Sequence, residues 1–124
     1  MTFEDVRALA LGLPEVEEST WFGTPSFKVR GKSFSRLREE GDVLVVKAEM
    51  GLREALIAAQ PDTYFMTPHY QDYPYVLVRL PAVETAALAD LLADAWAMTA
   101  PKRLVAAFGA AAEEDDGTNG AGAE

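Results

Sequence analysis

The chain has 124 residues, a net charge of −9 and no cysteine, and 49% of its residues are apolar. This length suits a single domain, and no apolar run approaches the roughly 20 residues that a membrane helix needs, so we expect a globular protein with no membrane partner. The absence of cysteine excludes disulfides, zinc–thiolate sites and thiol catalysis. The acidic N-terminal residues lack the features of a secretory signal, which makes the cytoplasm the expected location.

The N-terminal residues predict a helix. Thr2 is a favourable N-cap residue, acids follow in the first turn, apolar residues recur along one side, and Gly12 with Pro14 ends the pattern. A loop over 15–18 and a short strand over 19–22 should come next.

Residues 25–38 predict a β-hairpin. Apolar residues alternate with basic ones up to a turn at Gly31-Lys32, and the chain then returns through Phe34 and Leu37. Because these last two residues stand three positions apart, they can share a face of the sheet only if the return strand contains a bulge.

The second half of the chain should complete the sheet and cover it. Val43–Val46 is an unbroken apolar run, which predicts a central strand with both faces covered. The other expected elements are a helix over 51–60, strands over 62–66 and 75–80, and a long helix over 83–98 that Ala100-Pro101 either kinks or separates from a short last helix. This order predicts an α+β two-layer sandwich, an antiparallel sheet packed on helices with its other face open.

The last segment differs in composition from the rest. Residues 109–124 contain five carboxylates, no base and no large apolar side chain, so we expect a disordered acidic tail after a single domain over 1–108. The tail contributes 0 − 5 = −5 to the net charge, and the domain contributes 11 − 15 = −4.

Five of the eleven Lys and Arg residues lie between residues 24 and 38, where no carboxylate occurs. Cations on a strand can meet phosphates, and neighbouring aromatic rings can stack on bases. The candidate nucleic-acid contacts are therefore Lys28, Arg30, Lys32, Arg36 and Arg38. The alternative is that these cations serve solubility and protect a sheet edge. The mild negative charge of the domain argues against tight binding over its whole surface.

An aromatic loop forms the second candidate site. Rigid and aromatic residues between 67 and 74, together with Trp21, are candidates to border a groove: His69, Tyr70 and Tyr73. The alternative is a loop whose prolines only fix its path. No serine lies in a Gly-x-Ser-x-Gly elbow, His69 is the only histidine, and the acids over 15–18 lack the pattern of a calcium loop. We therefore expect no catalytic residue, metal site or cofactor.

Three segments resemble the MmcQ/YjbR family of small bacterial proteins. They are Gly23–Phe34, the stretch from Thr67 through Tyr73-Pro74 to Leu80, and Trp96 with Ala100-Pro101. The resemblance covers about residues 2–108. It implies an antiparallel sheet packed on helices, similar to the fold of type III secretion chaperones. It implies nucleic acid as a partner, since the family carries a DNA-binding label, and it supplies no catalytic residues.

Two functions stay open at this point. One is a small non-enzymatic binding protein that contacts nucleic acid through the basic hairpin. The other is a protein-interaction or chaperone-like module that holds a peptide against an exposed sheet face or the aromatic loop, as a monomer or a homodimer.

Overall fold

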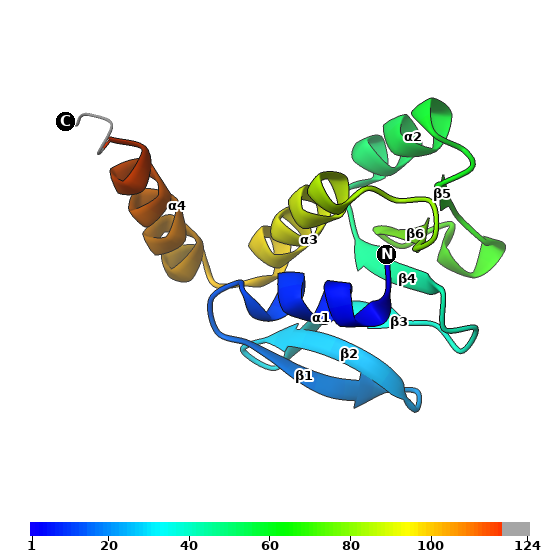
Figure 1. Ribbon diagram of the computed structural model, residues 1–124, viewed down its shortest axis with the longest axis horizontal. Coiled ribbons are helices and arrows are strands. Elements are labelled where there is room, and N and C mark those ends of the chain that lie inside the picture. The colour runs from blue at the N-terminus through cyan, green and yellow to red at the C-terminus, as the bar shows by residue number, and fades with distance from the viewer. Residues whose placement is uncertain (118–124) are drawn as a thin grey trace.

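Helices cover one face of a six-stranded antiparallel sheet in a computed structural model of the chain, which describes residues 1–117, with side chains through residue 109 (Figure 1). The strands are β1 (Val16–Trp21), β2 (Thr24–Val29), β3 (Lys32–Leu37), β4 (Val43–Lys47), β5 (Tyr64–Phe65) and β6 (Tyr75–Arg79). The helices are α1 (Phe3–Leu11), α2 (Met50–Ala59), α3 (Thr85–Thr99) and α4 (Lys102–Gly117), with a 3-10 turn, η1, at Pro68–Tyr70. The expected α+β sandwich is confirmed.

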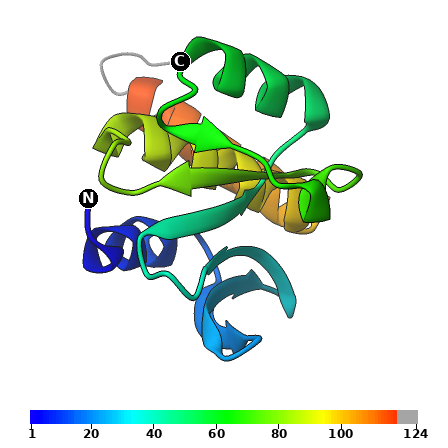
Figure 2. The ribbon, with the colours of Figure 1, turned by 90° about the vertical axis from the view of Figure 1, so that its right-hand side faces the viewer.

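The sheet order is β1-β2-β3-β4-β6-β5, and every neighbouring pair is antiparallel. The predicted central strand is β4, which lies between β3 and β6 and buries four consecutive apolar residues. In Figure 2 strands β4 and β6 pass in front of α3. The main core lies between the sheet and α1 and α3, where Phe27, Leu44 and Trp96 are buried.

We call the sheet surface turned away from this core the open face. One complete row of cross-strand neighbours defines it, namely Ser19, Ser26, Arg36, Val45, Leu77 and Phe65. Within this row Val45 and Leu77 form a second apolar cluster with Val43, separate from the main core. Tyr70 and Tyr75 pack on that cluster, so aromatic rings cover the β4-β6-β5 end of the open face.

The predicted bulge is present. Phe27 pairs with Ser35 and Lys28 pairs with Ser33, so the register shifts at Phe34. The extra residue brings both Phe34 and Leu37 to the side of the main core, as their spacing required.

Local details differ from the sequence expectations at three places. Residues 16–18, expected in a loop, belong to β1, because pairing with β2 outweighs the low strand propensity of the acids. The hairpin turn is centred on Arg30-Gly31, both with positive φ, one residue earlier than expected. The backbone over 109–117 is helical where a tail was expected, and three consecutive alanines in it favour a helix. Residues 118–124 of the expected tail lie outside the described residues.

Replacing Leu91 by Ala should lower the free energy of unfolding by about 2–5 kcal/mol, because it leaves a cavity under α3 where this side chain is 4% exposed. Urea denaturation measures the loss. Met98→Ala is the control on the same helix. Its side chain is 40% exposed, so this change should cost less than about 1 kcal/mol. Equal losses in the two variants would contradict the described packing.

Candidate binding surface on the open sheet face

The open face is cationic although the protein is acidic. Four of the five strand cations occupy it by the alternation of the strands: Lys28, Arg36, Lys47 and Arg79. Of the two strand carboxylates, Glu17 is on the open face opposite Lys28, and Glu18 faces the helices and pairs with Arg7 of α1. Strand alternation thus separates charge between the two sides of the sheet.

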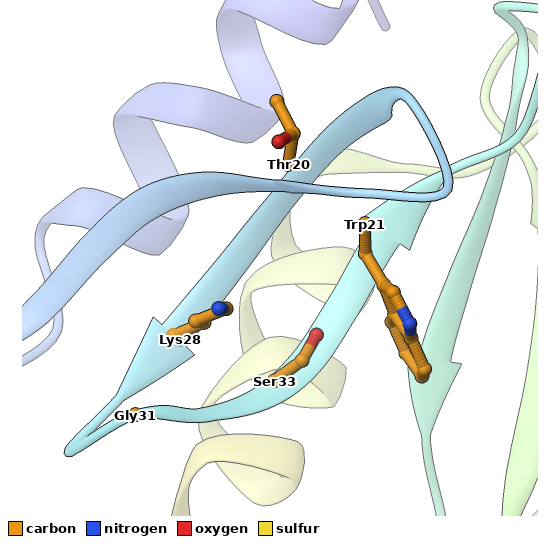
Figure 3. A pocket seen from close by; sticks show the side chains of 5 residues that line it. All are labelled: Thr20, Trp21, Lys28, Gly31 and Ser33. Atoms are coloured by element: carbon orange, nitrogen blue, oxygen red, sulfur yellow. The ribbon is translucent and has the colours of Figure 1, made fainter.

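A hollow of about 280 Å³ lies at the β1-β2-β3 end of this face (Figure 3). It is lined by Thr20, Trp21, Lys28, Gly31 and Ser33. In Figure 3 the side chains of Lys28 and Trp21 lie on either side of Ser33. The hydroxyl oxygens of Ser33 and Ser26 are 2.8 Å apart and share a hydrogen bond. The hollow therefore combines one ammonium group, one indole ring and a hydroxyl pair.

The turn between β1 and β2 carries the most exposed large apolar side chain among the residues whose side chains are described. Phe22 is 72% exposed and Trp21 is 39% exposed, and their rings stack at 5.3 Å. Phe22 and Gly23 both have positive φ, the combination of a type I′ hairpin turn. Asn or Gly is the usual residue at the first of these positions, so Phe22 combines backbone strain with exposure of an aromatic ring to water.

Arg36 joins this turn to the aromatic loop. Its side chain is largely buried, donates to the Thr24 hydroxyl at 3.2 Å and to the Tyr70 hydroxyl at 3.4 Å, and lies 5.5 Å from the Phe22 ring centre. Its nearest carboxylate oxygen, that of Glu39, is 3.8 Å away on an exposed side chain. The guanidinium is thus held mainly by neutral groups and stays a cation of the open face.

A second buried arginine fixes the aromatic loop. Arg53 of α2 is 5% exposed and donates only to backbone carbonyls among the described residues. One of its terminal nitrogens lies 2.9 Å from the carbonyl oxygens of Tyr70 and Tyr73 and 3.2 Å from that of Tyr75, and the other lies 3.0 Å from that of Gln71. The loop is held by a charged donor where regular strand pairing is absent.

The five predicted hairpin cations do not form one patch. Arg30 pairs with Glu15, and Arg38 pairs with Glu40 at 3.2 Å. Lys32 pairs in register with Val29, a residue of the main core, so it leaves the open face. Lys28 and Arg36 remain on that face. Lys47 and Arg79, which sequence reasoning did not select, join them from β4 and β6.

The predicted groove residues are only partly brought together. Trp21 lines the hollow, and Tyr70 connects to that end of the sheet through Arg36. Tyr70 also packs edge-on against His69 and Tyr75, and burial raises the pKa of Tyr75. His69 and Tyr73 are exposed and do not line this hollow. Phe22 was not among these groove residues, although its ring was one of those near the hairpin that could stack on bases, and it packs on Trp21.

The described part of the chain shows neither a membrane-spanning helix nor a cluster of metal ligands. Residues 1–117 contain no helix long and apolar enough to cross a membrane. Among residues 1–109, whose side chains the structure describes, no three His, Asp or Glu side chains gather closely enough to hold a metal ion.

Known proteins resemble this chain both in sequence and in fold. The family model described as YjbR matches residues 11–98. Uncharacterised proteins of Mycobacterium tuberculosis and Mycobacterium bovis are each 38% identical over 122 residues, covering 86% of this chain and 95% of theirs. A Deinococcus radiodurans crystal structure with the domain DUF419 has a TM-score of 0.68 and 25% identity, covering 78% of this chain and 77% of that one.

Replacing Arg53 by Ala should lower the free energy of unfolding by about 2–4 kcal/mol, because buried carbonyls of the aromatic loop lose a charged donor. Amide hydrogen exchange over residues 68–75 should accelerate more than exchange in β2 and β3. Arg53→Lys is the matched control, which keeps the charge but loses the planar fork, so its loss should be intermediate. An Ala variant as stable as the native chain would contradict this role.

Proposed function

The chain belongs to the YjbR family, and we propose that it is a non-enzymatic protein that binds single-stranded nucleic acid. The charge and shape of the open face support this proposal and make that face the binding surface. The observation that carries the proposal is Phe22. It is 72% exposed at a position of positive φ, beside Trp21 and next to the cationic part of the open face. Folding alone would favour Asn or Gly at this position. We therefore infer that the aromatic ring of Phe22 is there to contact a ligand.

Single strands fit this surface better than a duplex. The bases of a single strand can leave their neighbours and stack on exposed aromatic rings, each such contact being worth about 1–3 kcal/mol. The Lys28 ammonium lies in the same hollow as the Trp21 indole, where it can meet the phosphate next to a stacked base. Such contacts are tolerant of sequence, since every base has a flat face and phosphates carry no sequence information.

The same exposed rings also favour the second candidate, a peptide bound on the open face. The two differ in their electrostatics, because a nucleic acid needs the cations and an apolar peptide needs only the rings. Salt dependence and charge-removing variants therefore separate the two proposals.

Replacing Phe22 by Asn should raise the free energy of unfolding by about 0.5–1 kcal/mol, since Asn adopts positive φ at lower cost. The same change should weaken binding of a labelled single-stranded oligonucleotide by about tenfold, the lower half of the range for one lost stacking contact. Thermal unfolding and fluorescence anisotropy measure the two effects. Arg30→Asn, at the equivalent position of the other turn, is the control that should leave binding unchanged. Native affinity in the Phe22 variant would remove the stacking role.

Binding of a single strand of about 12 nucleotides should weaken with salt, with a slope of log affinity against log salt of about −2 to −3, as three or four phosphate contacts require. The double variant Lys28→Ala with Lys47→Ala should reduce the size of this slope by about 1.4. The variant Arg30→Ala with Lys32→Ala removes the same charge from the hairpin end and should leave the slope nearly unchanged.

Three outcomes would count against this proposal. Absence of binding at ~50 mM salt, a low salt at which phosphate contacts are strong, would refute nucleic-acid binding. Equal effects of the two double variants would show that only overall charge matters. Duplex bound as tightly as single strand would refute the choice of single strands.

A further inference from the structure

A groove runs between α2 and α3. Both helices lie on the side of the sheet away from the open face (Figure 1). Two hollows of about 270 and 220 Å³ form it, and they adjoin, since Leu52 and Asp94 line both. One continues to Glu49 and Met98, and the other continues to Leu56, Tyr64, Ala87, Asp90 and Leu91.

The two helices that border this groove run antiparallel to each other. The start of α2 faces the end of α3 at Glu49 and Met98, and Leu56 near the end of α2 faces Ala87 near the start of α3. From Ala87 to Met98 the groove spans eleven residues of helix, which is about 16 Å or three turns. The apolar side chains along it include Met98, which is 40% exposed.

The charges along this groove are all negative. Glu49, Asp90 and Asp94 line it, and no Lys, Arg or His does. None of these three carboxylates forms an ion pair with another described residue. Asp90 and Asp94 are also four positions apart on α3, a spacing at which like charges repel and weaken a helix.

We propose that this groove binds a cationic amphipathic helix of a partner protein. The floor matches apolar side chains that recur every three or four residues, and the three carboxylates match Lys or Arg beside them. A helix satisfies its own backbone hydrogen bonds, so it can lie along a groove between two helices without pairing with a strand. Nucleic acid is excluded from the groove by the carboxylates, so this site is independent of the one proposed on the open face.

The test uses a labelled 18-residue model helix with Leu at helical spacing and Lys on both sides of the apolar stripe, titrated against the full chain by anisotropy. We expect saturable binding that weakens as salt rises. A peptide of the same composition in scrambled order should bind at least about tenfold more weakly, since it cannot place apolar and basic groups together. A version with Glu in place of Lys should not bind.

Variants of the chain locate the site. Asp90→Asn with Asp94→Asn should weaken binding about tenfold, by removing two ion pairs. Glu54→Gln with Asp62→Asn removes the same charge outside the groove and should have little effect. Met98→Lys places a cation on the exposed floor and should abolish binding while the chain stays folded, which circular dichroism checks.

Several results would overturn this inference. They are no binding of the model helix at low salt, equal binding of the scrambled peptide, or equal effects of the two double variants. A second copy of the chain in the groove would also overturn it, and would appear as a dimer by light scattering that Met98→Lys dissociates.

Discussion

The contact between Arg53 and the backbone carbonyls of the aromatic loop determines much of the arrangement on the open face. It holds the loop that carries Tyr70, and Tyr70 covers the second apolar cluster and accepts from Arg36. Arg36 in turn contacts Thr24 and the Phe22 ring. A guanidinium suits the position of Arg53 because its donors are arranged in a rigid fork. Without it, the buried carbonyls of the aromatic loop would lack hydrogen-bond donors, which is costly.

Alternation along the strands explains why an acidic protein can have a cationic surface. Neighbouring residues of a strand point to opposite faces, so a single sheet can direct most of its bases to one side. Glu17 is the one strand carboxylate on the open face, and Glu18 next to it is already used by Arg7. Net charge therefore says little about what a particular face of this protein binds.

The sequence was sufficient to predict the elements whose signals are local. The N-cap at Thr2, the apolar run of β4, and the bulge required by Phe34 and Leu37 all follow from neighbours in the chain. The charges of the hairpin could not be assigned in this way, because Arg30 is neutralised by Glu15, fifteen residues earlier. The bulge also reverses which positions of β3 face outward, so Ser33 and Arg36 share a face although they are three residues apart.

The role of Arg53 was equally hidden, since its acceptors are backbone carbonyls 17 to 22 residues away and carry no sequence signal. Other cations of the open face were hidden because their placement depends on pairing between strands, as for Lys47 and Arg79.

The open face is more positively charged than the layer of helices α1–α3. Helices α1–α3 carry five carboxylates and two guanidiniums, one of them buried, while the open face carries four cations and one carboxylate among its strand residues. In the field of a polyanion such a molecule is oriented before it makes contact, with the open face toward the polyanion and helices α1–α3 on the far side. A partner on the helical side would then be carried on the outer surface of the complex, facing solvent.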